Sequence, residues 1–220
     1  MSASELYTAL AGKISLSARQ WWPDYGSFWV VISAILGQNT KFENALKALN
    51  NLRNDGVDSL ESLVGIPTTK LAELIKPAGF YNTKAKRLNS LAKAICADFG
   101  DFESFKQNVS KQWLFSQKGL GSESVYSVLC FACERAYMVY DSYSARLLNE
   151  LGYEFESYEE GREFLEGVLS ETGAKDGAGE ELSEALLCAH FHALTTEFCK
   201  AHLKGKVFDN EAKEFLKTLL

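Results

Sequence analysis

The chain is poor in proline and lacks any long apolar run. Its three prolines, Pro23, Pro67 and Pro77, each stand at a plausible helix boundary, so most of the 220 residues are free to form helices. The longest apolar stretch, residues 28–36 interrupted by a serine, is far shorter than the roughly 20 residues that cross a bilayer. No charged segment followed by an apolar one opens the chain, as a secretory signal would. We therefore expect a cytoplasmic protein without a membrane partner.

Cysteine is too sparse and too scattered for a disulfide framework. The five cysteines are an odd set, and the pair Cys130 and Cys133 lies inside a helical pattern, which favours buried, reduced thiols. A helical metal site could be drawn from Cys188, His192, Cys199 and His202. No compact ligand spacing supports it, so we expect no metal.

Apolar residues recur at helical spacing almost throughout, which predicts an all-α fold. Clear examples are residues 42, 45, 46 and 49, and residues 88, 91, 92 and 95. We expect helices from 67 to 77, 82 to 98, up to the turn at 119, 122 to 134, 141 to 151, and a final one from 182 to 204. Glycines in residues 171–180 predict a loop.

The net charge of −6 argues at first against a nucleic-acid partner, but the charges are unevenly distributed. Residues 70–121 carry nine basic and four acidic side chains, whereas residues 150–184 carry two basic and twelve acidic ones. The basic middle could face a polyanion, or both stretches could be ordinary solvated helix faces.

A Gly-Leu-Gly turn lies in the basic stretch, at Lys118, Gly119, Leu120, Gly121 and Ser122. Glycines permit positive φ and close approach of a partner, and Ser122 is a suitable N-cap for the next helix. Free amides at a helix start attract phosphate. The turn therefore suits a helix-hairpin-helix DNA clamp, although a plain turn between packed helices has the same residues.

Four segments in order resemble the endonuclease III superfamily of DNA glycosylases. These are residues 32–40, residues 79–85, the turn at 118–124, and residues 138–143 with Asp141. Residues 21–23, 38–43, 79–82 and 117–119 are most similar to the 3-methyladenine DNA glycosylase III group. The resemblance implies two helical lobes with an interlobe DNA-binding cleft: six helices in residues 25–134, ending in the hairpin, and a second lobe from residues 1–24 and 135–220.

The resemblance also assigns DNA contacts. Gln38 would fill the space that a flipped base leaves, and Phe80 would wedge into the base stack. Lys118, Gly119, Leu120, Gly121 and Ser122 would hold backbone phosphates. From the residues alone, Gln38 could be a polar helix end and Phe80 a core contact.

A pocket of aromatic side chains would suit a positively charged base. Electron-rich rings attract cations, so Trp21, Trp22 and Phe42, with Pro23 as a flat wall, are expected around a methylated purine. Each could instead be core packing, and periodicity alone places Phe42 on the apolar face of its helix.

Asp141 and Glu123 are the candidate catalytic residues. A carboxylate at Asp141 could stabilise an oxocarbenium-like state and orient water, although it could also be a simple N-cap. Strand-cleaving relatives carry a lysine nucleophile where this chain has Glu123, and a carboxylate forms no imine. The chain departs from the family in one further respect: it lacks the family's four-cysteine cluster, because only Cys188 and Cys199 lie near the C-terminus. We therefore expect no iron-sulfur cofactor.

Together these features predict a monomeric, monofunctional glycosylase that removes alkylated purines, chiefly 3-methyladenine, from double-stranded DNA. A cationic purine is already a good leaving group, which fits the small set of catalytic side chains. Two alternatives stay open: a glycosylase for mismatched adenine or an oxidised base, and a DNA-binding protein without catalysis.

Overall fold

The computed structural model describes residues 1–170 and 173–220, and it divides into two compact units. Unit 1 comprises residues 1–23 and 134–220, and unit 2 comprises residues 24–133. The described chain is all-α apart from one two-stranded hairpin, as the periodicity predicts. None of its described helices is both long and apolar enough to cross a membrane.

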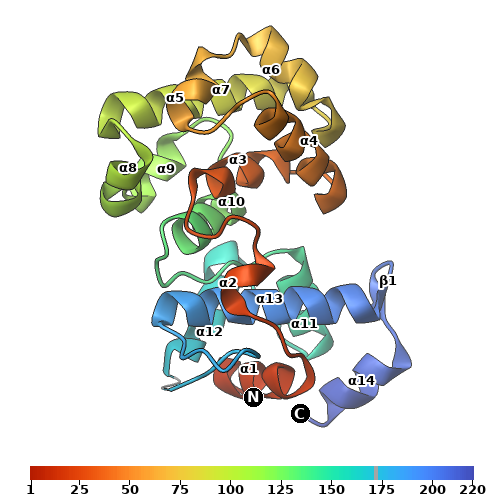
Figure 1. Ribbon diagram of the computed structural model, residues 1–220. Helices are drawn as coiled ribbons and strands as arrows, with labels where there is room; N and C mark the ends of the chain where they lie inside the picture. The colour runs from red at the N-terminus through yellow and green to blue at the C-terminus, as the bar shows by residue number, and fades with distance from the viewer. Residues whose placement is uncertain (171–172) are drawn as a thin grey trace. The chain divides into compact units, whose positions relative to one another are not determined.

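Unit 2 is a helical domain, coloured orange to green in Figure 1. Its elements are α3 (Phe28–Leu36), α4 (Phe42–Asn54), α5 (Leu60–Gly65), α6 (Thr68–Leu74), η1 (Lys76–Ala78), α7 (Tyr81–Phe99), α8 (Phe102–Asn108), α9 (Lys111–Ser116), α10 (Ser122–Ser127) and η2 (Val128–Ala132). The stretch from 24 to 133 thus holds eight α-helices where we expected six. Gly100, with φ +85°, ends α7, and the side chains of Asp101 and Ser110 cap α8 and α9.

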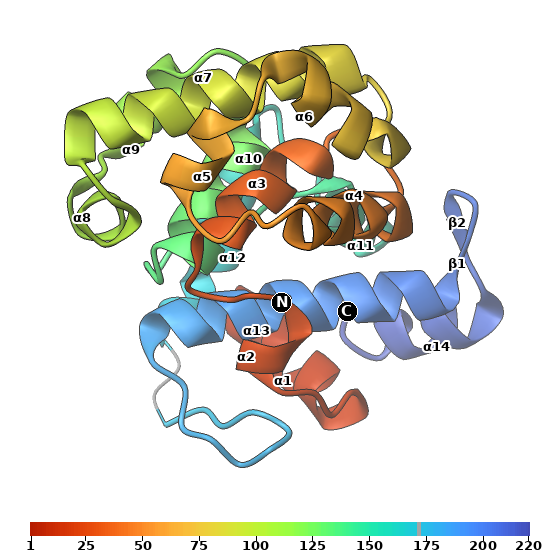
Figure 2. The ribbon, with the colours of Figure 1, turned by 45° about the horizontal axis from the view of Figure 1, so that its top comes forward.

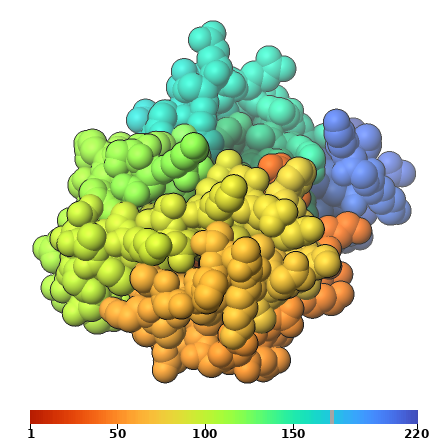
Figure 3. Space-filling view, turned by 90° about the horizontal axis from the view of Figure 1, so that it is seen from above, coloured from red at the N-terminus to blue at the C-terminus, as the bar shows by residue number. Residues whose placement is uncertain are grey.

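The core of unit 2 forms around α3, which is apolar on nearly all sides and almost completely buried. Helix α7 packs against α5 and α6, and its buried residues include Ala85, Leu88 and Leu91. Figure 3 shows α5, α6 and α7, in orange and yellow, on one face of this unit. The packed helix α7 therefore fixes the position of residues 79–80, which directly precede it.

Unit 1 is built around one long helix. Its elements are α1 (Ala3–Lys13), α2 (Ala18–Trp21), α11 (Ser142–Glu150), α12 (Tyr158–Glu166), η3 (Gly167–Ser170), α13 (Glu184–His202), β1 (Leu203–Lys204), β2 (Val207–Phe208) and α14 (Asn210–Lys217). Helix α13 packs against α1, α2 and α11, and Figure 2 shows α1 and α2 beside it. The side chains of α13 are buried along most of its length.

The predicted helix from 182 to 204 is confirmed as α13 (Glu184–His202), but the expectation that it is the final element is wrong. Helix α13 ends at His202, and the antiparallel hairpin β1–β2 and α14 follow it. Gly205, with φ +72°, makes the hairpin turn, and the Asp209 side chain accepts a hydrogen bond from the Ala212 amide to cap α14. Gly205 and Asp209 are typical of a turn and of a helix N-cap and could have indicated this change of direction. The search for helical periodicity did not detect them.

The predicted loop at 171–180 begins on residues 171 and 172, which lie outside the described residues. In its described part, Asp176 is buried and accepts hydrogen bonds from the amides of Ala178 (2.9 Å), Glu180 (3.0 Å) and Ala18 (3.1 Å). Ala18 is the first residue of α2, whose own cap, Ser17, makes no side-chain hydrogen bond. Asp176 therefore ties the loop to the start of α2.

Two buried histidines on α13 make the stability of unit 1 sensitive to acid. Burial lowers the pKa of His190 and of His192 below the ordinary 6.5, against opposing effects of the carboxylates of Asp176 and Asp141. The Tyr7 hydroxyl lies 3.0 Å from His190 Nδ1, and His192 Nδ1 lies 3.3 Å from the Val139 carbonyl oxygen. Because a carbonyl can only accept, His192 donates from Nδ1 as a neutral ring.

Acidification should destabilise the protein through these histidines. Below pH 6.5 the unfolded chain binds protons that the folded rings do not, so the free energy of unfolding falls as the pH falls. The slope approaches about 1.4 kcal/mol per pH unit for each such group. His192→Asn keeps a donor near the Val139 carbonyl and removes the titration. Urea denaturation at about pH 7.5 and about pH 5 should show a smaller acid loss for this variant. An equal loss in wild type and variant would contradict the assignment.

Candidate functional site

The Gly-Leu-Gly turn joins α9 to α10 in unit 2. Gly119 has φ +93°, and a Cβ on it would lie 2.4 Å from Arg87 Nε, so only glycine fits there. Gly121 differs, because its φ is −97° and nothing lies within 4 Å of a Cβ. The first glycine is therefore required by the turn, and the second leaves an open approach to the start of α10.

The start of α10 has no side-chain cap. The N-cap is Gly121, so the prediction of Ser122 as N-cap is wrong, and Ser122 is the first helical residue. The positive end of a helix dipole attracts anions, so the start of α10 suits one. Lys118, Gly121 and Glu123 are exposed around this end, whereas Leu120 is buried and anchors the turn.

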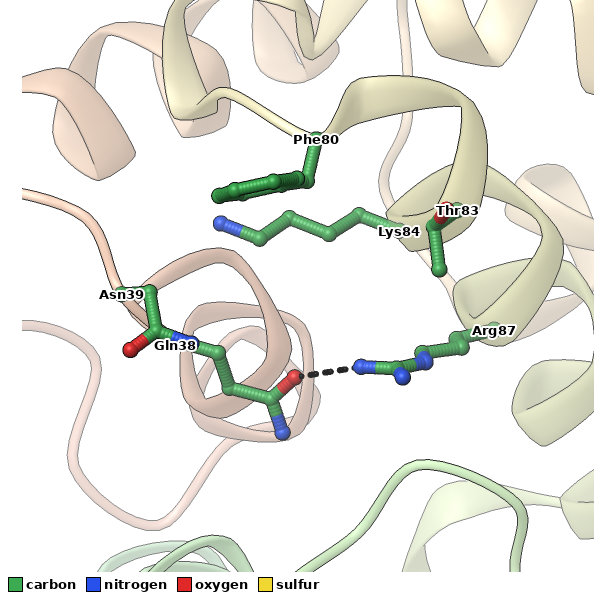
Figure 4. Close-up of a pocket in the computed structure, with 6 residues that line it drawn as sticks. All are labelled: Gln38, Asn39, Phe80, Thr83, Lys84 and Arg87. Carbon is green, nitrogen blue, oxygen red and sulfur yellow. Dashed lines mark hydrogen bonds between the residues drawn. The ribbon is translucent and has the colours of Figure 1, made fainter.

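Gln38 lies just beyond the end of α3, and its side chain is bonded to the turn. Gln38 Nε2 donates to the Gly119 carbonyl and to Ser124 Oγ, each at 2.9 Å, and Gln38 Oε1 accepts from Arg87 Nη1 at 3.0 Å. Figure 4 shows the bond to Arg87. The structure thus brings Gln38 and the turn together. Both the nitrogen and the oxygen of the Gln38 side-chain amide make hydrogen bonds.

Phe80 is exposed and strained. Its side chain is 73% exposed, which is opposite to the core contact that the residues alone allowed. Phe80 has φ 46° in the left-handed region, directly after Gly79 at φ +66°, and it serves as N-cap of α7. Such a conformation costs about 1–3 kcal/mol in a non-glycine residue and persists where the surroundings impose it. The fold therefore presents a bare phenyl ring at a fixed position.

Phe42 is the first residue of α4 and is half exposed. The helical periodicity placed it on the apolar face, and this expectation is wrong. Position 42 lies in the first turn, before the buried stripe of Ala45, Ala48 and Leu49 begins. Phe42 and Phe80 are thus both exposed rings of unit 2.

Trp21 and Trp22 form a half-buried pair in unit 1, with Pro23 directly after them. Their rings meet edge to face, with centroids 5.9 Å apart, and Trp21 makes a similar contact with His192 at 5.6 Å. Trp21 Nε1 donates to Glu197 Oε1 at 2.9 Å. The indole of Trp21 is therefore held in one orientation by two side chains of α13.

Asp141 caps α11 with one of its two carboxylate oxygens. Oδ1 accepts hydrogen bonds from the Tyr143 amide (3.0 Å), the Ser144 amide (2.8 Å) and Ser144 Oγ (3.1 Å). Within the described chain, Oδ2 makes no hydrogen bond. The group is part-exposed, so the cap fixes the carboxylate while one oxygen stays available.

His192 contacts the Trp21 ring, and the Asp141 carboxylate raises its pKa against the larger effect of burial. Its Nδ1 bond to Val139 is made just before Asp141 in the chain. In unit 1 the structure therefore brings together Asp141 and the Trp21–Trp22 pair, through a histidine that sequence reasoning considered only as a metal ligand.

The thiols of α13 do not fit an iron-sulfur cluster. Cys188 and Cys199 are buried, and burial raises the pKa of both, that of Cys199 to about 12. Cys199 Sγ donates to the Tyr143 carbonyl at 3.5 Å. A cluster needs four accessible thiolates, and the part of the chain that is described has no group of three or more His, Cys, Asp or Glu able to hold a metal.

Sequence reasoning also missed Lys84, Arg87 and Glu197, which hold the candidate residues in place. Lys84 and Arg87 had counted only toward the basic charge of the middle of the chain. Their contacts join segments distant in sequence, so no local pattern shows them.

Comparison with known proteins agrees with these features. Residues 32–170 match the family described as "HhH-GPD superfamily base excision DNA repair protein". A relative in Methanocaldococcus jannaschii, provisionally named as the DNA repair glycosylase MJ1434, is 34% identical over 206 residues, 90% of this chain and 88% of its own. Endonuclease III of Thermotoga maritima is 28% identical over 145 residues, 66% of each chain.

Solved structures show the same fold. The H. pylori 3-methyladenine DNA glycosylase (MagIII), solved bound to 1,N6-ethenoadenine, is 40% identical with a TM-score of 0.84, over 93% of this chain and all of that one. A non-covalent endonuclease III–DNA complex is 14% identical with a TM-score of 0.66, over 99% of both chains. The second likeness concerns the fold alone.

The two glycines of the turn should respond differently to substitution. Gly119→Ala forces a Cβ into Arg87 at positive φ and should lower the free energy of unfolding by about 1–3 kcal/mol. It should also weaken DNA binding, because the turn and the Gln38 contact shift together. Gly121→Ala, the matched control, should cost less than about 1 kcal/mol. Urea denaturation and fluorescence anisotropy with labelled duplex measure both effects. Equal effects of the two variants would contradict this reading of the turn.

Proposed function

The chain belongs to the HhH-GPD superfamily of base excision DNA repair proteins, and from that premise we propose that it is a monofunctional glycosylase that removes alkylated purines, chiefly 3-methyladenine. DNA glycosylase activity and DNA binding through a helix-hairpin-helix follow from the family and its relatives. The alkylated substrate and the lack of strand cleavage are what we propose beyond that.

The observation that carries the proposal is the group in unit 1 formed by Asp141, His192 and the Trp21–Trp22 pair. A part-exposed carboxylate with one oxygen held by helix amides lies beside a histidine that contacts the Trp21 ring. Stacking on an aromatic face is worth about 1–3 kcal/mol per base, and a positively charged purine gains further from the electron-rich ring. The 40% identity to a 3-methyladenine glycosylase supports the same substrate class.

The chemistry asks little of the protein. In a 3-methylated purine nucleotide the bond from C1′ to the base breaks with both electrons going to the ring, which leaves as a neutral base. The Asp141 carboxylate stabilises the positive charge that develops on the sugar and orients water. The water oxygen bonds to C1′, and its proton passes to the carboxylate or to solvent. His192, which is neutral and already bonded to Val139, holds the surroundings of Asp141 in place.

Unit 2 would bind and distort the duplex. The uncapped start of α10, with Lys118, suits backbone phosphate, which fixes register without reading sequence. Gln38 and the exposed ring of Phe80 would enter the base stack, and the exposed Phe42 ring adds an apolar surface. Extruding a base costs a few kcal/mol, and a damaged base lowers that cost.

The residue at position 123 determines whether the protein can cleave the DNA strand after the base has left. Glu123 stands in the first turn of α10, where strand-cleaving relatives are expected to carry a lysine, and a carboxylate cannot form a Schiff base. An exposed carboxylate at this position could instead polarise a nearby base or water.

Removing the charge of Asp141 should abolish base release. Asp141→Asn retains a side-chain oxygen that can accept from the Ser144 amide, so α11 stays capped. We expect release of 3-methyladenine from alkylated DNA, measured by chromatography of the free base, to fall by about 100-fold or more. Binding to the duplex should change little.

The control is Asp101→Asn, the same change at the cap of α8. Full release by Asp141→Asn, or no release by the wild type, would reject the proposal. Single-lesion duplexes with an oxidised base or a mismatched adenine distinguish another glycosylase specificity. Equal binding to damaged and undamaged duplex without release would indicate a DNA-binding protein without catalysis.

The product should be an intact strand with an abasic site. Because Glu123 replaces the lysine, end-labelled duplex should stay uncut until it is heated in alkali. Borohydride, which reduces an imine to a stable link, should trap no protein on the DNA. A covalent complex in borohydride would show lyase chemistry from another amine and contradict this part of the proposal.

A further inference from the structure

Lys84 is a buried lysine without an acidic partner. It lies one turn into α7 and is 2% exposed. Its ammonium donates three hydrogen bonds: to the Leu36 carbonyl at 2.8 Å, to Thr40 Oγ1 at 2.7 Å and to the Ala78 carbonyl at 2.8 Å. No ion pair involves Lys84 in the described chain. Three neutral oxygens therefore satisfy a buried charge, which is an unusual way to place a lysine.

These three oxygens belong to two separate segments. Leu36 ends α3, and Thr40 lies in the following segment, 37–41, which also carries Gln38. Ala78 ends η1 and precedes the segment 79–80, which carries Phe80. Thr40 Oγ1 also donates to the Ala78 carbonyl. Residues 36–40 and residue 78 are thus joined at one point, and Lys84 is the donor common to both.

Each of these two segments contains one residue with strained backbone. In the first it is the neighbour of Gln38, and in the second it is Phe80 itself. Asn39, next to Gln38, has φ 50°, and Phe80 has φ 46°. Left-handed backbone in non-glycine residues costs about 1–3 kcal/mol and is retained only where other contacts impose it. The Lys84 hydrogen bonds fix the Leu36 and Ala78 carbonyls, which precede Asn39 by three residues and Phe80 by two, so they are contacts that can impose this backbone.

The same lysine lines a pocket between the two segments. Figure 4 shows Gln38, Asn39, Phe80, Thr83, Lys84 and Arg87 around it, and its volume is about 170 Å³. Burial, with a smaller effect of the neighbouring Arg87 charge, lowers the pKa of Lys84 to about 8. Burying this charged ammonium therefore costs free energy of folding. Such a cost is expected of a side chain that serves to position its neighbours rather than to stabilise the fold.

We propose that Lys84 is a positioning residue that sets the Gln38 and Phe80 segments in one arrangement for entry into the DNA stack. This inference rests on the proposed function, since it takes Gln38 and Phe80 as the inserting side chains. Lys84 is buried beneath them, so it acts through their backbone and not by touching DNA.

Replacing Lys84 by methionine tests this. Methionine has similar length but donates no hydrogen bond, so the Leu36 carbonyl loses the Lys84 donor, the Ala78 carbonyl keeps only the Thr40 hydroxyl, and the strained segments are held less firmly. The single-turnover rate of base release from a single-lesion duplex should fall about 10- to 100-fold, the effect of a small misplacement in a preorganised site. Binding to undamaged duplex through the hairpin should remain close to that of wild type.

A second readout separates positioning from a general loss of structure. A duplex containing a stable abasic analogue, with 2-aminopurine beside it, brightens when a side chain enters the stack and disturbs its neighbour. At saturating protein, wild type should give the full increase and Lys84→Met a reduced one. Saturation removes any effect of affinity, and circular dichroism confirms that the variant is folded.

Matched variants make the result specific. Lys86→Met changes an exposed lysine two residues further along α7 and should behave as wild type. Thr40→Val removes the hydroxyl that links Lys84 to Ala78 and should repeat the Lys84→Met defect, whereas Thr40→Ser should restore function. If Lys84→Met does not fold, the comparison of Thr40→Val with Thr40→Ser still tests the proposal.

The outcomes distinguish this inference from the proposed function. No base release and no brightening with wild type would overturn both. Base release and brightening by Lys84→Met and Thr40→Val equal to those of wild type would overturn only the role of Lys84. A defect in both variants that Thr40→Ser repairs would support it.

Discussion

The part of unit 2 that we propose to contact DNA depends on one constraint: the backbone where α3 ends must be held against the start of α7 and against the hairpin turn. Two side chains of α7 meet this constraint. Lys84 bonds the carbonyls before the Gln38 and Phe80 segments, and Arg87 bonds the Gln38 amide while lying over Gly119. A buried ammonium is costly unless hydrogen bonds satisfy it, whereas glycine adopts the positive φ at position 119 without strain. The backbone of the segments that carry Gln38 and Phe80 is therefore fixed before any DNA is bound.

In unit 1 the constraint is different: one carboxylate is held in a fixed orientation. Asp141 serves as the cap of α11, where helix amides bind Oδ1 and leave Oδ2 without a partner in the described residues. Burial keeps His192 neutral, so it adds no competing positive charge beside the carboxylate. The same helix, α13, orients Trp21 through Glu197. A reaction whose leaving group is already cationic can proceed with such a small set of groups.

Local signals allowed part of this to be predicted from the sequence. The all-α fold followed from periodicity, the Asp141 cap from its place before a helical pattern, and the turn from its glycines. What periodicity misjudged was residues at helix ends: Phe42 is exposed because the buried stripe starts later, and α13 is followed by a hairpin and α14. The roles of Lys84, Arg87 and His192 could not be predicted, because each depends on contacts between segments more than 40 residues apart. The positive φ of Phe80 could not be predicted either, because phenylalanine rarely adopts it, whereas asparagine, as at position 39, does so more often.

The most direct test of the account is a crystal structure of Asp141→Asn bound to a duplex that contains a stable 3-methyladenine analogue, one whose bond to the sugar resists hydrolysis. The account predicts that the purine lies outside the duplex against Trp21 and Trp22, with Gln38 and Phe80 in the base stack and a phosphate at the start of α10. A purine still stacked in an undistorted duplex, or one extruded while Gln38 remains bonded to Gly119 and Phe80 stays outside the DNA, would contradict it.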